Sequence, residues 1–287
     1  MVGVVVGVLV SMLDIPSFVV TLAFFLGLQA VGLVILGNGG DLAIRGVLRD
    51  MAIKNVPVAV GWIAAVAITV GYAALQLLRH RSQVRRGLAH KPIALVLLQV
   101  AVVAAVVLGL TAVLSTNRGR SPAFPIEGVP WVVPIVVVLL LLWTFVLRST
   151  RFGRHLYAIG GNEEAARRAG IKVVRIKIAA FVIGSSMAAV SGLLAAADTG
   201  GVSTGDGAGN ELLYAVGAAV IGGTSLFGGR GRVIDGVIGG FVIATIPNGL
   251  GLLDQGSEIN FAVTGVVLLL AASVDAISRR RRSSSGV

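Results

Sequence analysis

The chain has 287 residues, of which 56% are hydrophobic and only 13% are charged, and its mean hydropathy is +0.93. This composition excludes an ordinary soluble globular protein and is typical of an integral membrane protein. The sequence contains no cysteine, which excludes disulfides, thiolate metal sites and thiol nucleophiles.

Apolar runs that meet or approach the roughly 20 residues needed for a membrane span follow one another along the chain. The first run, Met1–Leu13, is too short to span and has no positive region before it. We expect it either to be the remainder of a segment whose upstream spans are missing or to be half inserted. We predict an all-α polytopic bundle of about eight full spans plus this partial one, formed by residues 1–278. The expected spans are Ile15–Leu36, Pro57–Leu78, Pro92–Leu114, Trp131–Leu147, Ile176–Ala197, Leu212–Phe227, Ile234–Leu253 and Ile259–Ile277.

The net charge of +11 comes largely from basic segments between the apolar runs and from a basic tail at residues 279–287. The clearest basic loops are Arg79–Lys91 and Arg148–Lys177. Positive loops mark the cytoplasmic side of a membrane protein. The loops Ala197–Leu212 and Leu253–Ile259 carry acidic residues and no Lys or Arg, and we expect them outside. The charge therefore indicates membrane topology, with contacts to anionic lipids, and no nucleic-acid partner is expected.

A polar segment at residues 151–177, predicted to be a cytoplasmic loop, contains the signals of one short helix between Asn162 and Gly170. Asn162 is a good N-cap, and Gly170 is a natural C′ residue. Glu163 and Glu164 suit the positive end of the helix dipole, and each has an arginine four residues later, Arg167 and Arg168. A rigid surface helix between two spans is expected to meet a soluble partner.

The sequence lacks the patterns of common catalytic and nucleotide sites. It has no GxxxxGK[ST], HExxH or GxSxG motif, so we expect no catalytic residues, no metal and no cofactor on this chain. Its histidines, His80, His90 and His155, lie in basic loops. Asp235 follows Arg232 by three residues, which predicts a local ion pair. The inner spans carry no mid-span ionisable group, which argues against an ion-driven carrier.

Two further features suggest a polar path through the bundle. The segment Gly222–Gly229 (GGTSLFGG) contains Thr224 and Ser225 and is a poor helix former. It is either a broken segment near a translocation path or a site of tight packing followed by a turn. Asn248, which follows Pro247, could bind a hydroxylated solute or another helix. Asn210 and Glu211 could meet a delivered substrate or a partner at the outer mouth, or simply lie in a solvated loop.

The stretches FGRHLYAIGGNEEAARRAGIKVVRIK and VIGGTSLFGGRGRVIDGVIGGFVIATIPNGLGLL, with IPSFVVTLA near the start, resemble the permease subunits of bacterial ABC importers for monosaccharides. The features around Arg79–Ser115 and the loop Arg118–Pro130 look most like the xylose-type branch. Two departures stand out: the family has further spans before Met1, and Asp14 replaces the basic residue usual at that turn.

The resemblance implies that Gly161–Ile171 is a coupling helix that docks on a separate ATPase subunit, which binds ATP and Mg. It also implies a second permease copy, an extracytoplasmic sugar-binding protein and a monosaccharide substrate, with the chain in the bacterial inner (plasma) membrane. The substrate would be a pentose such as xylose. The expected coupling residues are Gly161, Asn162, Glu163, Glu164, Ala165, Arg167, Arg168 and Gly170, and the expected path residues are Thr224, Ser225 and Asn248.

Three alternatives remain open at this point. One is an ion-gradient-driven sugar carrier, against which the lack of mid-span carboxylates counts. A second is an intramembrane enzyme, which would need a clustered nucleophile, base or metal set. A third is a non-functional, N-terminally truncated permease.

Overall fold

The computed structural model describes residues 1–37, 40–47, 49–50, 55–85, 87, 92–117, 127–207, 209–226, 228–254 and 256–284, with the side chains of α12 described only as far as Ser273. Several residues named above lie outside these ranges, including Phe227, His90, Lys91 and most of the loop Arg118–Pro130. The side chains of the predicted basic tail lie outside them as well.

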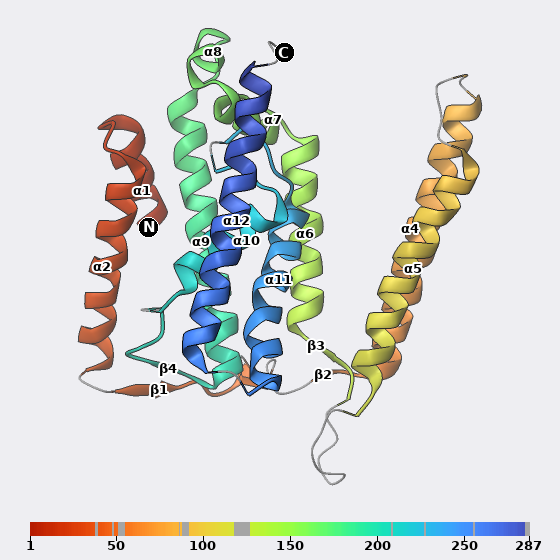
Figure 1. Ribbon diagram of the computed structural model, residues 1–287, viewed down its shortest axis with the longest axis horizontal. Coiled ribbons are helices and arrows are strands. Elements are labelled where there is room, and N and C mark those ends of the chain that lie inside the picture. Colours follow the sequence, from red (N-terminus) through yellow and green to blue (C-terminus); the bar gives the residue numbers. More distant parts are fainter. Residues whose placement is uncertain are drawn as a thin grey trace. The chain divides into compact units, whose positions relative to one another are not determined.

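The chain forms two units, which are described separately. The first unit, residues 1–44 and 137–287, contains most of the helices and one antiparallel ribbon of two strands (Figure 1). Its elements are α1 (Val2–Met12), α2 (Ser17–Leu36), β1 (Asp41–Ala43), α6 (Val132–Ser149, whose first residues belong to the other unit), α7 (Arg151–Gly161), α8 (Glu163–Arg168), α9 (Val173–Thr199), β4 (Gly201–Ser203), α10 (Glu211–Gly222), α11 (Val233–Leu252) and α12 (Ser257–Ser284).

The second unit, residues 45–136, is built on a pair of long helices that pack side by side (Figure 1). They are α4 (Val58–Arg85) and α5 (Ile93–Ser115). The strands β2 (Asn55–Val56) and β3 (Val129–Pro130) pair antiparallel within the same unit.

Six of the described helices are long and apolar enough to cross a membrane: α2, α4, α5, α6, α9 and α11. Their bounds confirm the corresponding predicted spans to within a few residues, except that α4 continues through the basic segment to Arg85. The helix α12 covers the predicted span Ile259–Ile277. The prediction of an all-α, multi-pass membrane protein is therefore confirmed.

The predicted span Leu212–Phe227 is wrong in length, because α10 has only 12 residues. It ends where Gly223 adopts the left-handed conformation, with φ of 112°, and the chain then leaves the helix through Thr224. Glycine takes this conformation without the steric cost that a Cβ would impose. The break after Gly222 and the close packing there agree with both interpretations of the glycine-rich segment, so its place beside a translocation path stays a prediction.

Close packing in the first unit depends on glycines that let helix backbones approach. Between α10 and α11, a side chain at Gly222 would overlap the Asp235 carbonyl, and one at Gly239 would overlap that of Ala218. Between α1 and α9, a Cβ at Gly7 would lie 2.9 Å from the Cα of Ile178. Small residues at helix contacts are the usual basis of association in a bilayer, where dispersion rather than water exclusion holds helices together.

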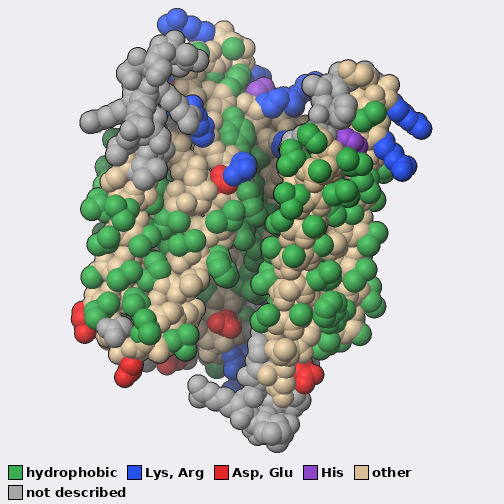
Figure 2. Space-filling model, turned by 45° about the vertical axis from the view of Figure 1, so that its right-hand side comes forward, with side chains coloured by type: hydrophobic (Ala, Val, Ile, Leu, Met, Phe, Trp, Pro, Cys, Tyr) green, Lys and Arg blue, Asp and Glu red, His purple; other side chains and the backbone are tan. Residues whose placement is uncertain are grey.

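Large apolar side chains are widely exposed on the helices of both units (Figure 2). Phe18 and Phe241 are each 72% exposed, and Val34 is 83% exposed. Such surfaces are unfavourable in water but match the hydrocarbon of a bilayer. Within the first unit, the ribbon β1–β4, with Asp41 opposite Ser203, lies at the end of the helices opposite α8 (Figure 1).

Candidate functional site

The short helix α8 confirms the prediction made from the pattern NEEAARRAG. Asn162 has extended backbone angles, and its side-chain oxygen accepts a hydrogen bond from the Ala165 N–H at 2.9 Å. This bond satisfies one of the free donors at the helix start. The N-cap assignment of Asn162 is therefore correct.

The other end of α8 closes as a Schellman motif. Gly170 takes a left-handed φ of 82°, and its N–H donates to the Arg167 carbonyl at 3.0 Å. The Ile171 N–H donates to the Ala166 carbonyl at 3.1 Å. These two bonds, together with the apolar contact of Ile171 beside Ala166, define the motif. A helix of only six residues, about 9 Å long, is thus closed at both ends.

The charged residues of α8 pair as the spacing predicts. Arg167 contacts Glu163 at 3.4 Å, and Arg168 contacts Glu164 at 3.2 Å. Glu164 and Arg168 are largely exposed, with 62% and 79% of their side chains accessible. Their pair stabilises the helix only slightly, so both groups remain available to a partner surface.

Glu163 has a second and closer partner, which sequence reasoning missed. Lys177 of α9 donates to both carboxylate oxygens of Glu163, each at 2.7 Å. The hydrogen bond from Lys177 is the main cause that lowers the pKa of Glu163 below its usual value of 4.5, with Lys177 and Arg167 charges adding to it and burial opposing it. The pair ties α8 to α9. The only sequence signal was a lysine in the first turns of a helix otherwise suited to a span.

Apolar contacts fix α8 on the helices before and after it. Ile159 of α7, Ala166 of α8 and Val173 of α9 are buried against one another, with Ile171 and Ile176 packed around them. A small residue at 166 lets α8 lie close to its neighbours. The short helix is therefore a fixed part of the first unit.

The helix α7 was not predicted, because the segment was interpreted as a loop with one short helix in it. Its start is capped by the Thr150 side chain, which accepts from the Gly153 N–H at 3.4 Å. Phe152, Leu156 and Ile159 recur at intervals of four and three residues and give the helix one apolar face. This spacing was the signal that could have revealed it.

The end of α7 contacts the loop between α10 and α11, and we call this contact the glycine joint: Gly160, Gly161, Gly228 and Gly229. A Cβ at Gly160 would lie 3.1 Å from the Gly229 Cα and 3.2 Å from the Gly228 carbonyl carbon, and closer still to the Gly229 nitrogen. The Tyr157 hydroxyl donates to the Gly231 carbonyl at 2.7 Å. The segment that carries α8 is thus in direct backbone contact with the α10–α11 pair.

The residues predicted to line a path are placed apart. Thr224 and Ser225 lie in the loop after α10, beside the glycine joint, and the Thr224 N–H donates to the Ala219 carbonyl at 2.8 Å. Asn248 lies near the far end of α11, about 20 Å along the helix axis from the start of that helix. Its side-chain amide donates to the Ala244 carbonyl of its own helix at 2.8 Å. The structure does not bring Asn248 together with Thr224 and Ser225.

Asp235 forms the local ion pair that the sequence predicts. It is 3% exposed, and its two oxygens accept from the Arg232 guanidinium at 3.1 Å and from the Arg232 backbone N–H at 2.7 Å. This pair caps the start of α11. Among the described residues, no three His, Asp or Glu side chains gather closely enough to hold a metal ion.

Comparison with known proteins identifies a family. Residues 1–272 match the family described as branched-chain amino acid transport system / permease component. The chain is 36% identical over 271 residues to the xylose transport system permease protein of Escherichia coli, an alignment that covers 93% of this chain and 65% of that protein. It is 34% identical over 268 residues to the xylose transport system permease protein of Haemophilus influenzae, covering 93% of this chain and 68% of that protein.

A ribose import permease protein of Escherichia coli is 40% identical over 148 residues, which is 52% of this chain and 46% of that protein. The chain thus spans about two thirds of the length of its xylose-permease relatives. No solved structure gives a significant match to it.

Proposed function

This chain belongs to the branched-chain amino acid transport system / permease component family, and on that premise we propose that it is the membrane-spanning permease subunit of an ATP-driven monosaccharide importer. A pentose such as xylose is the proposed cargo, because relatives that align over 93% of this chain are named as xylose transport permeases. ATP and Mg would bind to a separate ATPase subunit. The chain itself would supply the path and the contact that links ATP hydrolysis to its opening.

The observation that carries this proposal is the construction of α8. The helix is capped by Asn162, closed by the Gly170 motif and tied to α9 by the Glu163–Lys177 pair. A flexible loop pushed by a partner would absorb the motion in its own backbone. A short helix with fixed ends transmits the displacement to the segments on which it is packed.

The glycine joint supplies a route for that displacement. Motion of α8 would move the end of α7, and Gly160 would press directly on the backbone at Gly228 and Gly229. The α10–α11 pair is itself packed backbone to backbone at Gly222 and Gly239, so it would move as one body. Two copies of the chain around a common axis would then open the path to one side and close it on the other.

The decisive experiment is co-purification of the chain with its ATPase and sugar-binding protein, followed by reconstitution in liposomes. We expect ATP hydrolysis to be stimulated by the loaded binding protein, and labelled D-xylose to accumulate when the proton gradient is collapsed. Uptake that needs an ion gradient and ignores ATP would instead establish a secondary carrier and refute the proposal.

A further inference from the structure

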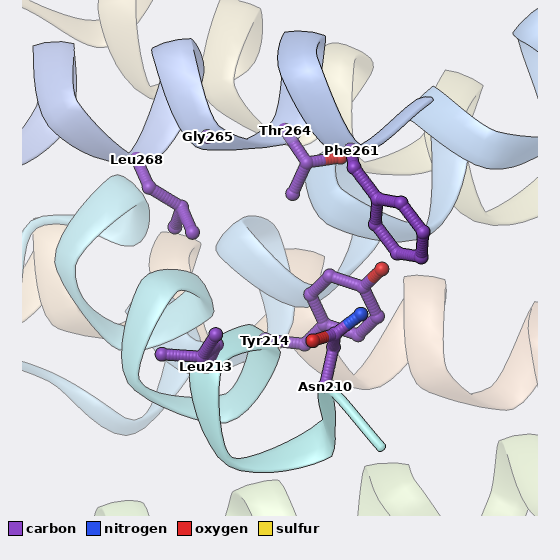
Figure 3. A pocket seen from close by; sticks show the side chains of 7 residues that line it. All are labelled: Asn210, Leu213, Tyr214, Phe261, Thr264, Gly265 and Leu268. Atoms are coloured by element: carbon purple, nitrogen blue, oxygen red, sulfur yellow. The ribbon is translucent and has the colours of Figure 1, made fainter. Parts of the chain in front are cut away.

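An open cavity of about 330 Å³ lies between α10 and α12, on the opposite end of α10 from the glycine joint. Its walls come from the first turn of α10 and the first three turns of α12 (Figure 3). The volume is at the lower end of the range of small-molecule sites, about 300–1,000 Å³. The lining residues are Asn210, Leu213, Tyr214, Phe261, Thr264, Gly265 and Leu268.

The cavity is a wedge whose closed end is a helix–helix contact. At Gly217 the two helices meet so closely that an added side chain would overlap Leu268. Toward the helix starts they separate, and Gly265 leaves the α12 wall bare, with no atom within 4 Å of the position that a Cβ would take. The cavity therefore depends on the positions of Gly217 and Gly265.

The lining combines apolar side chains, two of them aromatic, with the polar groups of Asn210, Tyr214 and Thr264. Figure 3 shows the rings of Tyr214 and Phe261, contributed by different helices, at the same end of the cavity. Within the described part of the chain, the Asn210 amide and the Tyr214 hydroxyl form no side-chain hydrogen bond. Thr264 is buried, with 5% exposed, and its hydroxyl donates a long hydrogen bond of 3.5 Å to the Asn260 side-chain oxygen.

This combination suits a sugar ring. The C–H face of a pyranose or furanose is apolar and packs on an aromatic ring, whereas its hydroxyls require donors and acceptors such as an amide and a phenol. A hydrocarbon ligand would leave the amide and phenol without partners, which is unfavourable. An ion would find no charged group among the lining residues.

The position of the cavity agrees with the direction of delivery. Asn210 follows β4 by seven residues, and β4 lies at the end of the unit opposite α8 (Figure 1). If α8 faces an ATPase in the cytoplasm, the cavity lies toward the outer face, where a binding protein would release its sugar.

We propose that this cavity is a weak acceptance site for a monosaccharide in its ring form, with Tyr214 and Phe261 as the stacking surface and Asn210, Tyr214 and Thr264 as the hydroxyl partners. The inference rests on the proposed function and adds to it the place where the sugar first meets the permease. Weak binding is sufficient there, because a tight site would retain the sugar.

The test is saturation-transfer NMR on the full chain in nanodiscs, with D-xylose and D-ribose as ring probes and mannitol as an open-chain control. We expect transfer to both sugars and much less to mannitol. Gly265→Leu places a side chain in the cavity from a position where a Cβ meets no atom within 4 Å, and it should raise the sugar Kd from the saturation-transfer titration about tenfold, a loss of about 1.4 kcal/mol of binding. Tyr214→Phe, which keeps the ring and removes the hydroxyl, should raise the Kd as well.

The matched control is Gly109→Leu on α5, since Gly109 is also an exposed helical glycine with open space around it. Equal signals from Gly265→Leu and Gly109→Leu, or equal transfer to mannitol, would overturn the cavity assignment. The liposome assay separates the two proposals. Normal sugar uptake by Gly265→Leu would refute the site and leave the importer intact, whereas absence of ATP-driven uptake by the unaltered complex would refute the importer and, with it, the site.

Discussion

Replacing Gly160 by alanine tests whether the glycine joint connects α8 to the α10–α11 pair. A Cβ at this position would meet backbone atoms of Gly228 and Gly229, which have no side-chain freedom with which to yield. One of the two segments must shift. The neighbouring Gly161 is an internal control, because a Cβ there has nothing within 4 Å.

The size of the effect follows from two opposing terms. Forcing an extra methyl group into a packed contact costs about 1–3 kcal/mol, whereas replacing glycine by alanine in a helix gains roughly 0.5–1 kcal/mol. Gly160→Ala should therefore be destabilising by up to about 2.5 kcal/mol, and Gly161→Ala neutral or slightly stabilising. A loss of 1 kcal/mol lowers Tm by about 2–4 °C in domains of about 150–250 residues, and a shift of that order is expected here.

The assay pairs thermal unfolding of the purified chain with coupling in liposomes. For Gly160→Ala we expect a lower Tm and about fivefold less sugar transported per ATP hydrolysed, since coupling free energies of about 1 kcal/mol correspond to that factor. Gly161→Ala should match the unaltered chain in Tm, because its Cβ meets nothing within 4 Å. Identical behaviour of the two variants would refute the joint as a link, and a lower Tm with unchanged coupling would reduce it to a packing contact.

Three further predictions concern charge and packing. Glu164→Arg should abolish coupled uptake while leaving membrane insertion intact, because the exposed pair it disrupts adds little stability; normal uptake would count strongly against docking through α8. Glu163→Gln should lower Tm at pH 7 by weakening the bond to Lys177, and since the pKa of Glu163 is depressed, its stabilising effect is present above pH 4.5 and is lost as pH falls through the lowered value. The Tm curves of the two proteins should therefore converge only in acid, and convergence near neutrality would contradict the assigned cause. Gly239→Ala, which forces a side chain onto the α10 backbone, should lower Tm and expression far more than Gly236→Ala, whose Cβ position is open; equal losses would show that α10 and α11 are not closely packed.

Local chemistry made α8 predictable in detail. Its cap, its charge pairs and its terminal glycine are all set by residues within one stretch of nine, so that no tertiary information is needed to place them. The long helices were predictable for a related reason: roughly 20 consecutive apolar residues in a bilayer have to satisfy their backbone groups within the segment, which a helix does. The family assignment likewise depended on local motifs.

The features that the sequence did not yield depend on contacts between distant segments. The Glu163–Lys177 bond requires α8 to fold back on α9. The early end of α10 depends on Gly223 adopting a left-handed conformation, and apolar composition alone suggested that the run continued. The cavity beside Tyr214 could not be predicted either. Its two walls are about 50 residues apart in the sequence, and Gly265, which has no side chain, leaves the space between them open.

The glycines of the first unit divide into two physical classes, and this division assigns them different tasks. Those at Gly160, Gly222 and Gly239 place backbone against backbone, so any displacement on one side is passed to the other without side-chain rotation to absorb it. The glycine at 265 faces open space, where the absence of a side chain makes room for something else. Under the proposed function, glycines of the first class would transmit motion and Gly265 would make room for a solute, at opposite ends of α10. The helix α10, whose 12 residues extend about 18 Å, connects the two ends, so we expect movement at the glycine joint to shift the cavity wall.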